Sequence, residues 1–378
     1  MNRIELLATL GQSVWLDAID RRLLDTGELA RLIDEGVSGL TSNPSIFEKA
    51  IAGSDAYDGA IAALADQRLG DEAMLERLVT DDIRRAADLF RPVYEHSSGG
   101  DGYVSIEVPP ALAHDASATI AAARRLWASV ERPNAMVKIP ATREGLAAIR
   151  TCLAEGINVN ATLIFSVERY LEVIDAYRAA LEARAAAGAS PAVASVASFF
   201  VSRVDTAVDA QIEQRMATLT DSVARADLAR LLGKAAVANA ARAYAEFRRR
   251  FSEPWFERLQ ALGARPQRPV WASTGVKNPQ YSPLLYCEPL IGRDTVNTLP
   301  PATLATLREI GTVRPRLHED AAEALATLAA LQEHGIDLAA VTASLETQGV
   351  ALFAQAYERL LQAIAAKRPA AAPGRAVA

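Results

Sequence analysis

The sequence predicts an α/β protein built as a single-domain (β/α)8 TIM barrel, with extra helices between strands and at the C-terminus. Eight short β-like runs alternate with long stretches rich in Ala, Leu, Arg and Glu, which are typical of helices. A doubly wound sheet is the alternative, but no Gly-x-Gly-x-x-Gly motif follows any of the runs. The chain has 378 residues, which leaves a surplus over the roughly 250 of a typical barrel.

The eight predicted strands are unevenly spaced. They are Val14–Asp17, Gly39–Thr41, Tyr103–Val108, Ala135–Ile139, Ile157–Leu163, Ala192–Val201, Pro269–Ser273 and Asp294–Leu299. Because they all lie between residues 14 and 299, we predict one domain over residues 1–366. The low-complexity end, residues 367–378, is predicted to be a flexible tail.

The surplus length is predicted to be helical. Helical insertions lie at about 50–95 and 205–265, and C-terminal helices at 301–366, the last of which we expect to turn back toward the barrel mouth. The first insertion holds two helical runs, Asp55–Gln67 and Asp71–Arg91. The clearest single helix begins at Ser166, a typical N-cap, and stops at Gly188.

Composition excludes several classes of protein. Half of the residues are hydrophobic and the formal net charge is only −6, which excludes a disordered chain. The slightly acidic balance, with no dense basic block, argues against a nucleic-acid binder. No apolar run is long enough for a membrane span, and the first ten residues do not resemble a signal peptide. We therefore expect a cytoplasmic protein with no membrane or nucleic-acid partner.

Cysteine and histidine are scarce and scattered. Cys152 and Cys287 lie far apart, and the four histidines show no metal-ligand spacing. We therefore expect no metal site, and core packing as the role of both cysteines.

Polar residues interrupt strands that should be continuously apolar in a parallel barrel. Those at or near the C-terminal strand ends are Asp17, Glu107, Lys138, Asn160 and Thr162. Burying such groups inside the barrel costs free energy, whereas the C-terminal mouth is where TIM barrels carry active sites. The pattern therefore favours a site at the mouth.

Structural interpretations remain open for each residue. Lys138 could extend to solvent with Glu107 as its ion-pair partner, and Asp17 could cap the helix that follows it. Asn43, followed by Pro44, has the pattern of a helix N-cap. Each interpretation is reasonable alone, but all of them together explain the pattern less well than an active site does.

The residue types fit Schiff-base aldol chemistry. A lysine in a partly desolvated pocket is a nucleophile toward carbonyls. Glu107 with Thr162 could handle the water lost from a carbinolamine, and Asp17 is a candidate base for the hydroxyl beside the breaking carbon–carbon bond. Asn43 and Asn160 could hold substrate hydroxyls.

Polar and cationic residues follow strands six and seven. Arg203 lies just past strand six, and the segment Ser273-Thr274-Gly275-Val276-Lys277-Asn278 follows strand seven. Hydroxyls, a glycine and a lysine in this loop suit an anion, so a phosphorylated sugar is the predicted ligand. A surface position for Arg203 and a plain glycine turn are the alternatives.

Seven motifs in the same order resemble the transaldolase family of the class I aldolase superfamily, over residues 14–300. They are VWLDAI around Asp17, TSNPSIF around Asn43, SIEVPP around Glu107, MVKIPAT around Lys138, NVNATLIFS around Asn160 and Thr162, SFFVSRVD around Arg203, and WASTGVKNP around Ser273.

The resemblance implies transfer of a dihydroxyacetone unit between sugar phosphates in the non-oxidative pentose phosphate pathway, with no metal or organic cofactor. The pairs are sedoheptulose 7-phosphate with glyceraldehyde 3-phosphate and fructose 6-phosphate with erythrose 4-phosphate. It implies Lys138 as the Schiff-base lysine, Asp17 as the base at the C4 hydroxyl, and Glu107 with Thr162 as the pair handling water. The implied substrate and phosphate contacts are Asn43, Asn160, Ser198, Phe200, Arg203 and Ser273.

The sequence departs from the common bacterial pattern and is similar to a longer bacterial subfamily. Ser-Phe-Arg-Asn is common after strand seven, so Lys277 becomes the candidate for the second phosphate-binding cation, and Phe199 replaces a common Pro. Related aldolases that release dihydroxyacetone from fructose 6-phosphate carry Tyr where this chain has Phe200, which favours transfer here. Such an aldolase and a non-catalytic sugar-phosphate-binding barrel are the alternatives. A homodimer is compatible with the resemblance.

Overall fold

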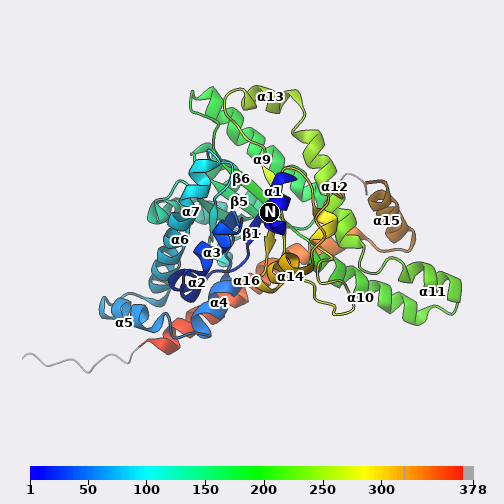
Figure 1. Ribbon diagram of the computed structural model, residues 1–378, viewed down its shortest axis with the longest axis horizontal. Coiled ribbons are helices and arrows are strands. Elements are labelled where there is room, and N and C mark those ends of the chain that lie inside the picture. The colour runs from blue at the N-terminus through cyan, green and yellow to red at the C-terminus, as the bar shows by residue number, and fades with distance from the viewer. Residues whose placement is uncertain (318–320, 369–378) are drawn as a thin grey trace, which may run out of the picture.

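Eight parallel strands form a closed barrel in chain order, β1 to β8, with β8 paired to β1 (Figure 1). The computed structural model describes residues 1–317 and 321–368, so most of the predicted tail at 367–378 lies outside the described residues. The strands are β1 (Gln12–Leu16), β2 (Gly39–Leu40), β3 (Val104–Glu107), β4 (Ala135–Pro140), β5 (Val159–Ile164), β6 (Ser195–Phe200), β7 (Arg268–Ala272) and β8 (Thr295–Leu299). The predicted TIM barrel is confirmed, and each strand overlaps its predicted range.

Helices fill the predicted insertions and surround the barrel. Before β3 lie α1 (Arg3–Thr9), α2 (Arg21–Asp25), α3 (Glu28–Asp34), α4 (Pro44–Ala52), α5 (Asp58–Asp66) and α6 (Asp71–His96). Between β3 and β7 lie the short 3-10 helix η1 (Pro110–Leu112), then α7 (Ala116–Val130), α8 (Arg143–Ala154), α9 (Val167–Ala186), α10 (Ser202–Thr218), α11 (Ser222–Ala229), α12 (Ala235–Arg250) and α13 (Pro254–Gln260). The 3-10 helix η2 (Glu288–Leu290) precedes β8, and α14 (Pro301–Ile310), α15 (Ala321–Glu333) and α16 (Leu338–Lys367) follow it.

Local capping explains several helix starts. Ser166 accepts a hydrogen bond from the Arg169 N–H at 3.0 Å and begins α9, as predicted. Asp20, and not Asp17, caps α2, so the capping interpretation of Asp17 is wrong.

Helix α6 continues past its predicted end at Arg91, through Pro92, to His96. Val93 packs against the main core and Tyr94 contacts Tyr103 edge-on at 5.5 Å between ring centroids. This packing outweighs the one backbone hydrogen bond that a proline removes near a helix end.

The barrel interior is apolar at its amino end. Trp15, Tyr103, Met136, Val196, Val270 and Val296 form a separate cluster there. The indole N–H of Trp15 donates to Asp101 at 2.7 Å, which satisfies its one polar atom. Above this cluster the interior becomes polar, because Asn160 of β5 bonds Ser105 of β3 and Ser198 of β6. The carboxyl end is therefore the end left open to chemistry.

Helix α16 turns back over the carboxyl end of the barrel, as expected. It lies beside α4 along the lower side of the molecule in Figure 1 and also contacts α6, α10 and β5. At Gly349 a Cβ atom would lie 3.2 Å from Leu163 at the end of β5, so this glycine permits the close approach. No helix within the two described ranges is long and apolar enough to cross a membrane.

The close fit of β1 against β2 generates a stability prediction. A Cβ at Gly39 would lie 2.5 Å from the indole nitrogen of Trp15, which is fully buried. We expect Gly39→Ala to lower the free energy of unfolding by about 1–3 kcal/mol, as overpacking of a rigid core does. Urea unfolding followed by tryptophan fluorescence measures this. Gly59→Ala in α5, where an added Cβ would meet no atom within 4 Å outside the local backbone of its own helix, is the control and should not destabilise the protein.

Candidate active site

Lys138 and Glu107 form a buried ion pair at the carboxyl end of the barrel. They stand opposite each other in the β3–β4 register, and Nζ lies 3.4 Å from Oε2. Their side chains are only 5% and 3% exposed. Nζ also donates to the carbonyl of Ser42 at 3.1 Å. The lysine is therefore held between a carboxylate and a backbone carbonyl, and it does not extend to solvent.

Asp17 completes a group of three charges. It follows β1 directly, and the hydroxyl of Thr41 donates to its Oδ1 at 2.7 Å. Burial raises the pKa of Asp17, while the positive charge of Lys138 and the Thr41 hydrogen bond oppose that shift. The carboxylate thus lies within electrostatic reach of the lysine, as a base near a Schiff base requires.

Glu107 also has a raised pKa. Burial raises the pKa of Glu107 to about 7, against the opposing charge of Lys138, and the charge of Asp17 adds to the increase. A carboxyl group with a pKa near neutrality gives and takes a proton readily at physiological pH. Such displacement is typical of functional sites.

Asn160 and Thr162 lie deeper in the barrel than the position at its mouth that the sequence predicted. Both are fully buried, and both the nitrogen and the oxygen of the Asn160 amide are engaged with Ser105 and Ser198. A bulge in β5 after Ala161 shifts the register beside Thr162. The Thr162 hydroxyl and both Glu107 oxygens have no hydrogen-bond partner among the described residues. These buried oxygens are free to hold a water molecule.

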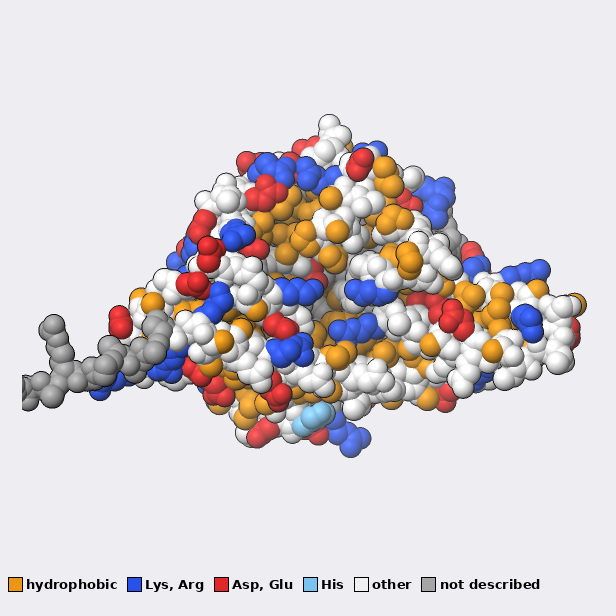
Figure 2. All heavy atoms as spheres, turned by 90° about the horizontal axis from the view of Figure 1, so that it is seen from below, with side chains coloured by type: hydrophobic (Ala, Val, Ile, Leu, Met, Phe, Trp, Pro, Cys, Tyr) orange, Lys and Arg blue, Asp and Glu red, His pale blue; other side chains and the backbone are white. Residues whose placement is uncertain are grey.

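The mouth of the barrel contains a pocket of about 530 Å³, counted out to its opening. Its lining residues are Asp17, Thr41, Asn43, Ser45, Lys138, Ser198, Phe200, Arg203, Ala272, Ser273, Thr298 and Phe353. Seven of these were predicted site residues, and the size suits a small polar ligand. The face that carries α4 and α16 is hollowed near its middle, with Lys and Arg side chains beside the hollow (Figure 2).

Cationic residues occupy one side of this mouth. Arg203, at the start of α10, is half-buried, lies 5.6 Å from the Phe200 ring centroid, and forms no ion pair with a described residue. Burial lowers its pKa. Ser273 is within 3.1 Å of Ser202, hydroxyl to hydroxyl. Lys277 is exposed at the rim, where its charge acts on Asp17.

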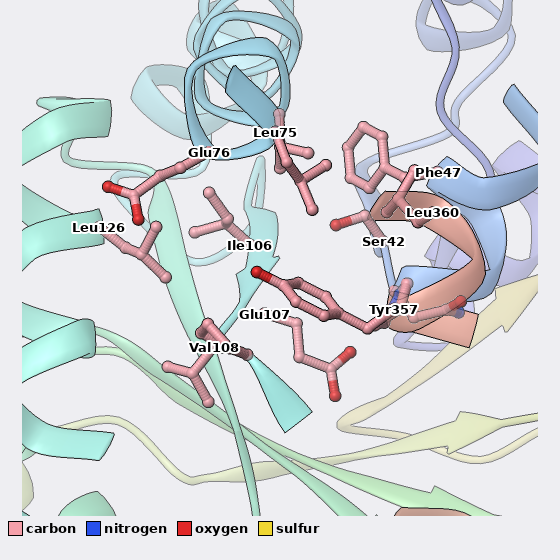
Figure 3. A pocket seen from close by; sticks show the side chains of 14 residues that line it. Ser42, Phe47, Leu75, Glu76, Ile106, Glu107, Val108, Leu126, Tyr357 and Leu360 are labelled. Carbon is pink, nitrogen blue, oxygen red and sulfur yellow. The ribbon is translucent and has the colours of Figure 1, made fainter. Parts of the chain in front are cut away.

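A second, mostly apolar cavity of about 500 Å³ lies on the other side of Glu107 (Figure 3). Side chains of β3, α4, α6, α7 and α16 line it, and Asn43 lines both cavities. Asn43 is also the N-cap of α4, accepting from the Ile46 N–H at 3.0 Å, so the capping interpretation of this residue is confirmed. Figure 3 shows the ring of Tyr357 beside Glu107, with its hydroxyl pointing away from the carboxylate.

Several residues of the site were not predicted from the sequence. Thr41 and Thr298 lie in predicted strands and Ser45 lies in the first turn of α4, and hydroxyls at these positions have no distinctive spacing. Ser42 contacts Lys138 through its backbone carbonyl, which any residue carries. Phe353 belongs to α16, far beyond the last strand, and only the path of that helix brings it to the mouth.

A lysine paired with a carboxylate at the carboxyl mouth of a TIM barrel is the arrangement that Schiff-base chemistry of the class I aldolase type requires. Residues 14–364 match the model of the Transaldolase/Fructose-6-phosphate aldolase family, and the chain belongs to this family.

Curated relatives cover almost the whole chain. A transaldolase of Thiobacillus denitrificans (strain ATCC 25259 / T1) is 50% identical over 366 residues, which are 96% of this chain and 100% of that protein. A transaldolase of Saccharopolyspora erythraea is 48% identical over 96% of this chain and 97% of its own length. A protein named Transaldolase 2 from a Nostoc species is 43% identical over 97% and 98%.

The titration of Glu107 predicts a pH-dependent difference in stability between the protein and its Glu107→Gln variant. The folded-state pKa of Glu107 is about 7 and its ordinary value is 4.5. The folded protein therefore binds this proton more tightly, and its stability falls as the pH rises from 4.5 to 7. One pKa unit corresponds to about 1.4 kcal/mol, so the free energy of unfolding of Glu107→Gln should gain about 2–3 kcal/mol relative to the parent over this interval. Urea unfolding at pH 5 and pH 8 measures it, and a pH-independent difference would contradict the raised pKa.

Proposed function

We propose that this protein is a transaldolase that transfers a dihydroxyacetone unit between sugar phosphates through a Schiff base on Lys138. Its donors and acceptors are the sedoheptulose 7-phosphate/glyceraldehyde 3-phosphate and fructose 6-phosphate/erythrose 4-phosphate pairs. The observation that carries the proposal is the buried Lys138–Glu107 pair, with Nζ 3.4 Å from Oε2, at the end of a pocket lined by Arg203. Family membership and the named relatives support the same activity.

The first half of the reaction forms the covalent adduct. The free amine of Lys138 attacks the C2 carbonyl of the ketose phosphate, and a carbinolamine results. Glu107, in its protonated form, donates a proton to the departing hydroxyl, water leaves, and a carbon–nitrogen double bond forms. The Thr162 hydroxyl and the Oε1 atom of Glu107, which have no hydrogen-bond partner among the described residues, are proposed to hold this water.

The second half moves the carbon unit. Asp17 takes the proton of the C4 hydroxyl, the C3–C4 bond breaks, and the aldose phosphate leaves while its electron pair stays as an enamine on the adduct. The enamine attacks the aldehyde carbon of the acceptor, and Asp17 returns its proton to the new hydroxyl. Water then adds to the iminium, the carbon–nitrogen bond breaks, and Lys138 is free again.

Substrate positioning is assigned to the lining residues of the mouth. Asn43 uses its oxygen as a helix cap, so its amide nitrogen is the atom available to a substrate hydroxyl. Asn160 fixes Ser198 from below through a 2.7 Å hydrogen bond, so Ser198 is the member of that pair that faces the pocket. Arg203, Ser273 and Lys277 are proposed to bind the phosphate.

Release of free dihydroxyacetone is the second candidate activity. Phe200 places an apolar ring in the pocket, without a hydroxyl that could assist attack by water, and this favours transfer. A non-catalytic barrel has less support, because the lysine and both carboxylates stay together. We also propose a cytoplasmic location, which is supported by two buried, unpaired cysteines, while a homodimer stays a prediction.

Borohydride trapping tests the proposal directly. Incubation with fructose 6-phosphate and sodium borohydride should reduce the Schiff base to a stable secondary amine on Lys138, seen as a mass increase on the peptide that contains it. Lys138→Ala should show no adduct and a loss of activity of at least about 10³-fold, as expected for removal of a covalent nucleophile. Absence of an adduct in the parent protein would refute the Schiff-base mechanism.

Removal of the rim lysine tests the phosphate site. We expect Lys277→Ala to raise the KM for fructose 6-phosphate about fivefold to tenfold, because one charged hydrogen bond to phosphate is lost. The kinetics with unphosphorylated fructose as donor should not change. Lys234→Ala, which removes a lysine 3.6 Å from Glu323, is the matched control with unchanged KM. Equal KM values for Lys277→Ala and the parent protein would show that Lys277 does not bind the phosphate.

A further inference from the structure

Helix α16 is held firmly across the barrel mouth at several points. Gly349 lets it approach Leu163 and Phe165 at the end of β5. Further along, Arg359 pairs with Glu48 of α4 through two contacts of 2.6 and 3.0 Å, and Lys367 pairs with Asp58 at 2.6 Å. Attachments on both sides of residue 353 therefore fix where its side chain lies.

Phe353 faces two of the cations of the mouth. Its ring centroid lies 5.9 Å from Nζ of Lys138 and 6.0 Å from the guanidinium carbon of Arg203. The residue is only 4% exposed and lines the same pocket as Asp17 and Ser198. It has no group that can exchange a proton, so the reaction steps assigned above give it no role.

The proposed reaction has a step at which water must be kept away. After the aldose phosphate leaves, the adduct on Lys138 has to persist until an acceptor aldehyde arrives. If the C3 carbon of the enamine instead takes the proton that Asp17 holds, the iminium forms again. Water then adds to the iminium carbon and gives up a proton to a nearby base, the carbon–nitrogen bond breaks, and free dihydroxyacetone and the lysine amine result. Exclusion of water from a closed site prevents such hydrolysis of a reactive intermediate.

We propose that Phe353 determines this partition: its ring excludes water from the Lys138 adduct and thereby favours transfer over hydrolysis. The inference rests on the proposed function. The ring covers Lys138 from the side of α16, where a smaller side chain would leave space for solvent. Its face also lies within the range of a cation–π contact with a positive group at Nζ, which is favourable for the iminium.

The test measures two rates on the same protein. Transfer is followed with fructose 6-phosphate and erythrose 4-phosphate, and hydrolysis is followed as dihydroxyacetone released from fructose 6-phosphate alone. We expect Phe353→Ala to raise the ratio of hydrolysis to transfer at least about tenfold, because water then reaches the adduct. A purely structural role would lower both rates together and leave the ratio unchanged.

Two further variants keep the inference testable if Phe353→Ala does not fold. Phe353→Met keeps an apolar side chain of similar length, so its ratio should stay within about twofold of the parent. Phe353→Gln has nearly the same length but is polar and attracts water, so its ratio should rise even if Phe353→Ala does not fold. Leu352→Ala removes an apolar side chain that is 48% exposed on the same helix, and both of its rates should match the parent.

Borohydride trapping separates this inference from the proposed function. An adduct on Lys138 with an unchanged ratio in Phe353→Ala and Phe353→Gln would overturn the inference and leave the Schiff-base mechanism intact. A parent protein without an adduct would instead overturn the proposed function, and this inference with it. An adduct in all variants, with the ratio raised only in Phe353→Ala and Phe353→Gln, supports both.

Discussion

The buried contact between Lys138 and Glu107 is the constraint on which the rest of the site depends. Removing two charges from water is costly, and at 3.4 Å their attraction compensates this cost only in part. The part of the desolvation cost that the attraction does not compensate affects Glu107, because burial raises the pKa of its carboxyl group to about 7. The same desolvation that weakens the folded protein gives the site a carboxyl group suited to proton transfer near neutral pH.

The buried Lys138–Glu107 pair lies at the carboxyl end of the barrel. Its amino end is filled by large apolar side chains such as Trp15 and Met136. A hydrogen-bonded layer of Ser105, Asn160 and Ser198 follows, and the charged residues come last. Polarity thus increases along the barrel axis, so stability comes from one end of the strands and chemistry from the other.

The surplus helices complete the site. A typical barrel would end near β8, but here α16 returns across the mouth and adds Phe353 to the pocket and Tyr357 beside Glu107. On the side of α16, the Phe353 ring centroid lies 5.9 Å from Nζ of Lys138. This C-terminal part of the extra length therefore contributes residues to both cavities of the site.

Sequence patterns predicted the barrel, the order of its strands and the charged residues at their ends. They did so because strand alternation and helix capping are local signals, and because a lysine or glutamate inside a parallel strand is conspicuous. They did not determine that Asn160 lies under the pocket, that Asp20 rather than Asp17 caps α2, or that the carbonyl of Ser42 holds Lys138. Nor did they indicate Phe353, since an apolar residue in an amphipathic helix has the same pattern wherever the helix packs. These features became visible in the folded chain, because they depend on which distant segments meet.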